Sequence, residues 1–305
     1  MVIKNFFRIF PLILKNLYFL TFLNGFLFST LLYFRMEASY ERELFTAIQR
    51  SINKKIDFND NEDSLVIKVM QSCNNLLFNR ASVFTENIED GLNDLKIDYL
   101  HPATIDLMTA RGACGSYSLV LARILQNYHL PVRIAQMKAR GRYGAHNIIE
   151  VELRSGWTVL DPTFNLYFTK PNEGLASFAD VKSNWSYYSK QLPKGYDSSY
   201  RYADARYTNW QKIPVILPLA KKILDLSIGK ERADGFCMRV YLLRMYDIYF
   251  YFTLLLFIPI LMITLKRSIK IKLFPRYDIP LTVSNIYKYM RIRLGDILLK
   301  KSMNA

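Results

Sequence analysis

Three residues in the middle of the chain, Cys114, His146 and Asp161, are of the types that together carry out acyl transfer by a thiol. A thiol is a weak nucleophile until it is ionised, and a thiolate can attack an amide carbonyl to form an acyl-enzyme. A histidine can take the thiol proton and later give it to the leaving amine, while an acidic side chain fixes the histidine tautomer. The sequence therefore offers one candidate each for a nucleophile, an acid–base group and an orienting carboxylate.

One helix and three strands would have to position these side chains. Apolar and small residues recur at helical spacing over residues 114–125, which predicts a helix that begins at Cys114. Unpaired backbone N–H groups and the helix dipole at that end would favour a thiolate. The predicted strands span residues 132–137, 146–153 and 157–160, with a hairpin turn before the last one.

Local pattern alone does not establish a catalytic site here. A lone cysteine at a helix start, a histidine in a strand and an aspartate before a proline are each more often structural than catalytic. Counting across the hairpin turn at Ser155-Gly156 also places Asp161 opposite Ile149 or Glu150, not opposite His146. A β-bulge or a strong twist is therefore expected to bring Asp161 and His146 together.

Several motifs occur together, in a fixed order, over about residues 111–165. They are Gly112-Ala113-Cys114-Gly115-Ser116-Tyr117, Leu130-Pro131-Val132-Arg133, His146-Asn147-Ile148-Ile149-Glu150-Val151, Gly156-Trp157 and Asp161-Pro162-Thr163. In these motifs and in their spacing the sequence resembles the transglutaminase-like superfamily, a branch of the papain-like cysteine enzymes. Two features differ from the family pattern: Asn147-Ile148 replaces the aromatic residue that follows the histidine, and His129 stands where glycine is usual at the helix end.

The resemblance implies a role for each of the three residues. Cys114 would be the nucleophile, His146 the general base and acid, and Asp161 the orienting partner. It also implies an α+β fold with a papain/transglutaminase-like core, in which the helix that bears the cysteine packs on an antiparallel sheet carrying His146 and Asp161. Papain itself is a poorer match, because Met108 stands six residues before Cys114, near where papain has its oxyanion glutamine.

Composition and charge exclude several other classes of protein. Hydrophobic residues make up 51% of the chain and charged residues 22%, which excludes a disordered or collagen-like chain. The net charge of +15 is concentrated at the two ends, where residues 1–35 carry four Lys or Arg and residues 266–305 carry ten. A DNA-binding domain instead spreads its basic residues over a folded surface, so no nucleic-acid partner is expected. Three cysteines and three histidines also argue against a disulfide scaffold and a multi-histidine metal site.

Two uncharged apolar runs predict membrane-spanning helices. Residues 16–34 and 248–265 would each form a helix roughly 28 Å long, close to the thickness of the bilayer hydrocarbon. The residues after the first run are not the small ones that signal-peptide cleavage requires, so an uncleaved anchor is expected. More Lys and Arg follow the second run than precede it, which favours a cytoplasmic C-terminus and an extracytoplasmic domain between the runs.

The predicted organisation has four parts. Residues 1–35 form a cytoplasmic N-terminus and the first transmembrane helix, and residues 36–247 form a transglutaminase-like domain with a helical N-terminal part and a Tyr-rich C-terminal extension. A second transmembrane helix (248–265) and a basic cytoplasmic tail (266–305) follow. Within the domain, Ser64 is the predicted cap of one helix, and residues 214–228 are a predicted amphipathic helix lying on the membrane surface or on the domain.

The leading hypothesis is a membrane-anchored thiol enzyme that opens a peptide or protein amide through an acyl-enzyme. Hydrolysis, as a cysteine peptidase or amidase, is favoured over amine cross-linking, because water needs no dedicated amine site. No cofactor or metal is expected, and the expected partners are the amide substrate and membrane lipids. The alternative is a catalytically idle membrane scaffold that uses the same fold for binding. Pairing of Cys73 or Cys237 with Cys114 in an oxidising compartment stays open.

Overall fold

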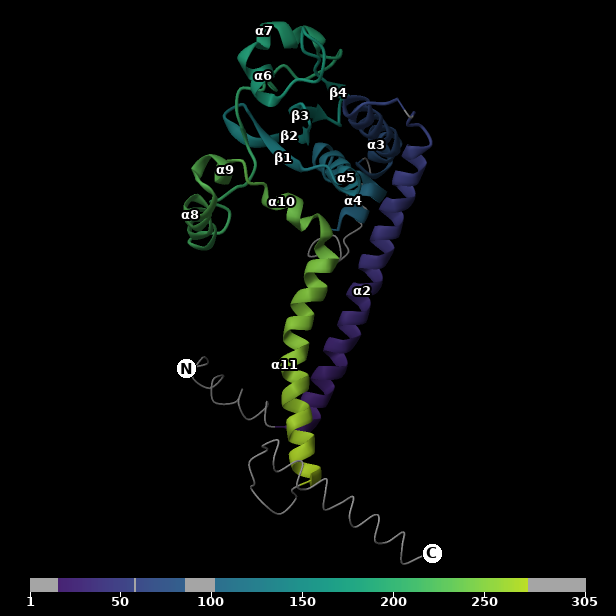
Figure 1. Ribbon diagram of the computed structural model, residues 1–305, viewed down its shortest axis with the longest axis vertical. Coiled ribbons are helices and arrows are strands. Elements are labelled where there is room, and N and C mark those ends of the chain that lie inside the picture. The colour runs from purple at the N-terminus through teal and green to yellow at the C-terminus, as the bar shows by residue number, and fades with distance from the viewer. Residues whose placement is uncertain (1–15, 58, 86–101, 274–305) are drawn as a thin grey trace, which may run out of the picture. The chain divides into compact units, whose positions relative to one another are not determined.

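The chain divides into two compact units in the computed structural model, which describes residues 16–57, 59–85 and 102–273 (Figure 1). One unit is Glu37–Tyr246, and the other contains the described residues up to 36 and from 247 onward. Cys114, His146 and Asp161 all belong to the first of these units.

The Glu37–Tyr246 unit is built on one antiparallel sheet of five strands in the order β4-β3-β2-β1-β5. The three long strands are consecutive in the chain and joined by tight turns, which suits antiparallel pairing. The strands are β1 (Val132–Ala139), β2 (Arg142–Leu153), β3 (Gly156–Asp161), β4 (Leu166–Tyr167) and β5 (Ala205–Arg206). The predicted strands are thus found, with β1 and β2 longer than expected.

Helices cover both faces of this sheet. Successive side chains of each strand point to opposite faces, and apolar side chains lie on both, so each face has its own core. Ile134, Ile149 and Val151 share a core with α3 (Glu62–Thr85), α4 (Ala103–Thr109) and α5 (Cys114–Asn127). Ala135, Ile148 and Val159 share a second core with α6 (Phe178–Ser183), α7 (Trp185–Tyr188) and the Tyr-rich segment that follows. A helix packed on an antiparallel sheet is therefore confirmed as the architecture around Cys114.

The first long helix, α2 (Leu17–Asn53), is a single element of 37 residues and extends well beyond the predicted span. Its second half belongs to the Glu37–Tyr246 unit, where Ala38, Phe45 and Ile52 form a buried stripe at helical spacing. A buried ion pair joins this half to α5, with Arg123 Nε 3.5 Å from Glu41 Oε1. Burial of an amphipathic face thus explains why the helix continues after the apolar run ends.

The start of α3 corrects one expectation. The helix begins at Glu62, and the Asn61 side-chain oxygen accepts a hydrogen bond from the Ser64 N–H at 2.8 Å. Asn61, not Ser64, therefore caps the helix, and the acidic Glu62 and Asp63 occupy its first turn.

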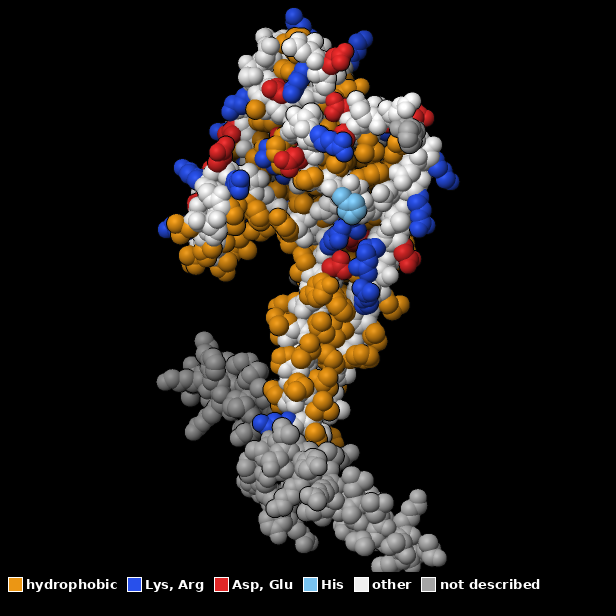
Figure 2. All heavy atoms as spheres, in the orientation of Figure 1, with side chains coloured by type: hydrophobic (Ala, Val, Ile, Leu, Met, Phe, Trp, Pro, Cys, Tyr) orange, Lys and Arg blue, Asp and Glu red, His pale blue; other side chains and the backbone are white. Residues whose placement is uncertain are grey.

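The C-terminal part of the unit contains short helices: α8 (Ile216–Ile228), α9 (Lys230–Asp234), α10 (Met238–Tyr241) and the 3-10 turn η4 (Leu242–Arg244). The predicted amphipathic helix is α8, and none of its residues is buried. Its apolar side chains, among them Ile216, Leu219 and Leu226, are exposed and form an apolar surface in Figure 2. The structure therefore gives no support to packing of this helix on the domain.

The second unit contains the first half of α2 and the helix α11 (Met245–Leu273) from residue 247 onward. Both helices are long and apolar enough to cross a membrane, and most side chains along them are exposed and hydrophobic (Figure 2). They meet through a hydrogen bond from Asn24 Nδ2 to Thr264 Oγ1 at 2.6 Å and through the rings of Phe28 and Phe257. Pro259 lies inside α11, which continues through it. Most of the predicted basic tail lies outside the described residues.

Candidate active site

Cys114 is the first residue of α5, as the sequence predicts, and its side chain is partly exposed. The turn before it is held by a chain of hydrogen bonds: the Gly112 N–H donates to Ser116 Oγ at 2.8 Å, and Ser116 Oγ donates to Asp106 Oδ1 at 2.6 Å. Ala113 has φ +44°, a conformation that L-residues rarely adopt. The tight turn therefore fixes the thiol at the helix end where backbone N–H groups have no intrahelical partner.

A β-bulge directly precedes His146 on β2. Met137 of β1 pairs with His146, and the next residue, Lys138, pairs with Tyr143, so that two residues of β2 are left over. Gly144, one of the two, has φ +88°, which glycine adopts without strain. Bulges re-aim the side chains beside them, so the irregularity lies where the orientation of His146 is decided.

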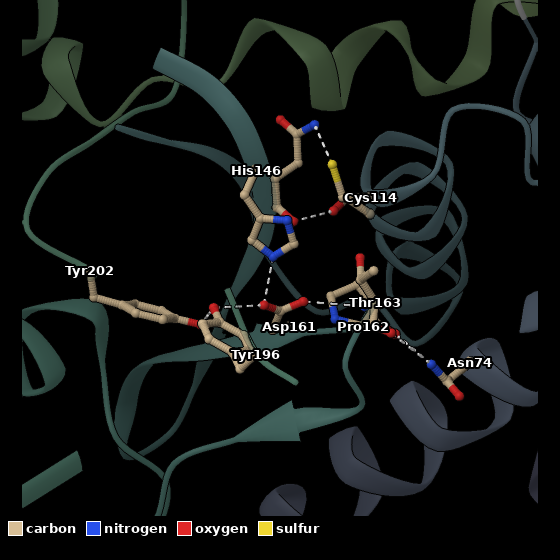
Figure 3. A network of polar contacts seen from close by, with 10 residues as sticks. Asn74, Cys114, His146, Asp161, Pro162, Thr163, Tyr196 and Tyr202 are labelled. Carbon is tan, nitrogen blue, oxygen red and sulfur yellow. Dashed lines mark hydrogen bonds and ion pairs between the residues drawn. The ribbon is translucent and has the colours of Figure 1, made fainter. Parts of the chain in front are cut away.

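Asp161 is the last residue of β3, and its side chain accepts a hydrogen bond from His146 Nε2 at 2.6 Å (Figure 3). Ile149 pairs with Leu160, so the same register places Asp161 level with Ile148. The count across the hairpin turn was therefore wrong, because it placed Asp161 opposite Ile149 or Glu150. Ile148 and His146 are two residues apart and share a face, which makes Asp161 a diagonal neighbour of His146. The expected bulge exists in the β1–β2 pairing, whereas the β2–β3 pairing is continuous.

Both oxygens of the Asp161 carboxylate are held. The Thr163 N–H donates to Oδ1 at 3.2 Å, and the Tyr196 hydroxyl donates to Oδ2 at 3.1 Å, beside the bond from His146. The carboxylate is 1% exposed. These bonds fix the position of the carboxylate, so that its Oδ2 is held against the His146 imidazole.

Aromatic rings enclose the His146 imidazole. The Tyr200 ring stacks on it with a centroid distance of 4.5 Å and an interplanar angle of 8°. Phe164 and Tyr196 approach its ring edges at 5.6 Å and 6.5 Å. These contacts leave His146 2% exposed and shield its bond to Asp161 from water.

The electrostatics distinguish Cys114 from the other two cysteines. Burial raises the pKa of the Cys114 thiol, but the hydrogen bond and charge of His146 and the bonds from Asn147 outweigh burial and bring the pKa below its ordinary value. Burial opposes protonation of His146, yet the bonds and charges of Asp161 and Cys114 raise its pKa to about 9. Burial instead raises the pKa of Cys73 and of Cys237. The arrangement therefore favours a thiolate at Cys114 and an imidazolium at His146.

Asn147 also contacts the thiol: its Nδ2 donates to Cys114 Sγ at 3.6 Å, and its backbone oxygen accepts a bond from Ser118. The side chain therefore places an amide donor beside the reacting atom. Asn147 belongs to the Asn147-Ile148 pair, which stands where an aromatic residue was expected after His146, and no role was predicted for Asn147 from the sequence. Tyr196 and Tyr200 were missed as well, because a Tyr-rich segment is equally typical of irregular loop packing.

The remaining expectations concern disulfides and metals. All three cysteines are free, with Cys73 and Cys237 buried in the domain core. Among the residues that the structure describes, no group of three or more His, Cys, Asp or Glu side chains is arranged to hold a metal ion.

Comparison of the chain with models of known protein families, with curated proteins and with solved structures found no match.

Proposed function

We propose that the protein is a membrane-anchored thiol hydrolase that cleaves an amide through an acyl-enzyme on Cys114. This proposal rests on the arrangement of Cys114, His146 and Asp161. The imidazole and the carboxylate form a 2.6 Å hydrogen bond, and the pKa of the thiol lies below its ordinary value. Buried structural cysteines have raised pKa values, as Cys73 and Cys237 do here, so a lowered pKa favours chemistry at Cys114.

The first half of the reaction forms the acyl-enzyme. The Cys114 thiolate attacks the amide carbonyl carbon, a C–S bond forms, and the carbonyl oxygen becomes an oxyanion. The Asn147 amide, whose Nδ2 lies 3.6 Å from Cys114 Sγ, is a donor that can stabilise this oxyanion. The His146 imidazolium then gives its proton to the amine nitrogen, the C–N bond breaks, and the amine leaves.

The second half releases the acid. Neutral His146 takes a proton from a water molecule, whose oxygen attacks the thioester carbon, and the C–S bond breaks to return the Cys114 thiolate and the His146 imidazolium. Through both halves Asp161 holds Nε2, so that Nδ1 is the nitrogen that exchanges protons. An amine in place of water would give cross-linking, and hydrolysis stays the favoured outcome because no dedicated amine site is required.

The fold around these residues supports a transglutaminase-like core as part of the proposal. A helix that begins with the cysteine packs on an antiparallel sheet, and histidine and aspartate come from adjacent strands in the order that the motifs suggest. The alternative, a catalytically idle scaffold, would not require a lowered thiol pKa, a held carboxylate and an enclosed imidazole together. We therefore favour the enzyme.

We further propose that α2 and α11 anchor the enzyme in a membrane, with the Glu37–Tyr246 unit outside the cytoplasm. The two helices have sufficient length and apolar character, and the excess of Lys and Arg after the second span favours a cytoplasmic C-terminus. Peptide or protein amides on the extracytoplasmic side would then be the substrates.

Alkylation of the purified protein with iodoacetamide across pH tests the chemistry without knowledge of the substrate. We expect Cys114 to react at lower pH than Cys73 and Cys237, since the pKa of its thiol lies below the ordinary value and theirs lie above it. Peptide mass spectrometry separates the three sites, so the two buried cysteines serve as internal controls. Equal rates at Cys114 and at a free thiol would overturn the enzyme proposal in favour of the scaffold.

A further inference from the structure

A cavity of about 450 Å³ lies beside the first turn of α5, where Gly115, the residue after Cys114, is part of its lining. Its lining includes Gly115 from the first turn of α5, Asn147 from β2, and Arg239, Lys212 and Leu242 from the C-terminal segments of the domain. The cavity is large enough for one or two amino-acid side chains, and two of its walls are formed by residues that flank the thiol. A group bound there would contact Asn147, whose side chain donates a hydrogen bond to Cys114 Sγ.

Arg239 brings a positive charge into this cavity. Its Nη1 donates to Asn147 Oδ1 at 3.3 Å, while Nδ2 of the same amide donates to Cys114 Sγ at 3.6 Å. The guanidinium is therefore separated from the sulfur by a single amide group. Arginine has five N–H donors in a fixed fork that matches a carboxylate, and one bond to an amide oxygen leaves most of them for a ligand.

Arg239 differs from other buried or half-buried arginines of the domain because it has no carboxylate as an ion-pair partner among the described residues. The half-buried Arg133 is paired with Glu150 at 2.8 Å, and the buried Arg123 with Glu41. Within the part of the chain that the structure describes, no carboxylate forms an ion pair with Arg239. A partly desolvated guanidinium without a carboxylate is costly unless an anion joins it during function.

The other charged groups around the cavity do not cancel this charge. Lys212 adds a second positive charge on an exposed side chain, and Asp106 is the one carboxylate in the described lining. The Asp106 carboxylate is 3% exposed and already accepts a bond from Ser116 in the turn before Cys114. Two cations and one engaged carboxylate leave the cavity positive.

We propose that this cavity binds a carboxylate of the substrate, so that the enzyme acts on amides with an acidic group close to the bond that is cleaved. Arg239 would hold the carboxylate, Asn147 would align it with the sulfur, and Lys212 would attract it at the cavity mouth. This inference rests on the proposed function, because it assigns a specificity to the same thiol. It predicts a preference for an acidic side chain or a terminal carboxylate next to the scissile amide.

Two alkylating reagents of nearly equal size test the inference on the full-length protein. Iodoacetate and iodoacetamide each lose iodide when the sulfur forms a bond to the CH2 carbon, and only iodoacetate carries a carboxylate. We measure the ratio of the two rate constants at Cys114, with glutathione as the reference thiol. The His146 imidazolium also attracts an anion, so the decisive quantity is the change in this ratio between variants.

We expect Arg239→Gln to lower the iodoacetate-to-iodoacetamide ratio by about tenfold, as loss of a charge-assisted bond predicts. Arg239→Lys, which keeps the charge, should restore most of the ratio. Lys212→Gln should lower it less, and this exposed side chain can be changed without disturbing the core. Arg154→Gln removes the same charge at a side chain that is 94% exposed and does not line the cavity, and it should leave the ratio unchanged.

A second measurement needs no variant. Glutarate, which cannot alkylate, should slow iodoacetamide labelling of Cys114 in a saturable manner, while glutaramide should not. If Cys114 reacts rapidly with iodoacetamide but Arg239→Gln leaves the ratio unchanged and glutarate gives no protection, the carboxylate site is wrong and the proposed enzyme stands. If Cys114 reacts no faster than glutathione with either reagent, the proposed function fails and this inference fails with it.

Discussion

The imidazole of His146 is held by one hydrogen bond and by contacts with three aromatic rings. Asp161 holds Nε2, Tyr200 covers one ring face, and Phe164 and Tyr196 crowd the edges. Burial on its own would favour neutral imidazole, and the bonds and charges of Asp161 and Cys114 together raise the pKa of His146 to about 9. A residue that does not contact the sulfur therefore contributes to the ionisation of the Cys114–His146 pair.

Asp161→Asn should consequently move the ionisation of Cys114 to higher pH. The amide keeps an acceptor for Nε2–H but loses the negative charge, so the pKa of His146 falls from about 9 and the weakened imidazolium no longer lowers the pKa of the thiol. Iodoacetamide labelling of Cys114 at pH 6 should slow by at least about tenfold, which corresponds to one pKa unit or more. Above pH 9 the wild-type and variant rates should converge.

The matched control for this variant is Asp204→Asn, which removes a carboxylate that bonds Tyr143 instead of His146. Its pH profile should coincide with that of the wild-type protein. An Asp161→Asn profile that also coincides with the wild type would show that the carboxylate does not affect the pKa of the thiol.

The directions of the two pKa shifts predict a bell-shaped pH profile for amide cleavage. The rate should decline in acid as the thiolate is protonated and decline again near pH 9 as the imidazolium loses its proton.

Residue type and order suffice to select Cys114, His146 and Asp161 as candidates, but not the groups around them. The three residues stand in separate motifs, and the structure brings them together through neighbouring strands and one helix start. Tyr196 reaches Asp161 from 35 residues away, and Arg239 reaches Asn147 from 92 residues away. Contacts at such separation depend on the path of a loop, which local sequence does not encode.

At the scale of elements, the turn that leads into α5 determines where the thiol lies. Gly112 approaches Ser116 so closely that no side chain fits: a Cβ there would lie 2.7 Å from Ser116 Oγ and 3.3 Å from its backbone nitrogen. The same Ser116 hydroxyl links Gly112 to Asp106 on α4. The start of the helix is thus fixed by close packing of the turn on the first turn of α5.

Gly112→Ala should therefore destabilise the domain and slow alkylation of Cys114, because the turn must move away from Ser116. We expect a loss of about 1–3 kcal/mol in the free energy of unfolding, the range for overpacking in a tight site. Gly115→Ala is the matched control for stability: its Cβ would meet only Asn147 Nδ2, at 3.8 Å, and alanine favours the helix over glycine. Thermal unfolding of the full chain in detergent compares the two, and equal stability would contradict the packing argument.

The register of the strands is the feature of the sheet that the sequence did not predict. Alternation of apolar and polar residues identifies β2 and β3, but a shift of one position in a hairpin decides which face a side chain occupies. Hairpin counting placed Asp161 one or two residues away from its observed level with Ile148. The bulge before His146 contains Gly144 in a conformation that local pattern does not predict. Helix length was also underestimated for α2, since burial against the domain extends it beyond the apolar run.

At the scale of the whole molecule, the chain combines one folded unit with a unit of two long apolar helices. Asn24 and Thr264 form a hydrogen bond between these helices, which pairs two polar side chains within a largely apolar surface. Under the proposed membrane anchoring, two spans would place the two ends of the chain on one side of a membrane and the segment between them on the other. This arrangement follows from the number of spans and holds for either orientation.

Protease treatment of sealed vesicles tests that arrangement. We expect tags on both termini to be protected together when the Glu37–Tyr246 unit is digested, and to be digested together in inverted vesicles, because the two spans return the chain to its starting side. The charge bias predicts that the tags are protected in vesicles with the cytoplasmic side inward. Protection of one tag alone would show a single span. Release of the whole protein by alkaline carbonate would show that α2 and α11 do not span a membrane, and the thiol chemistry of Cys114 would then have to act in a different setting.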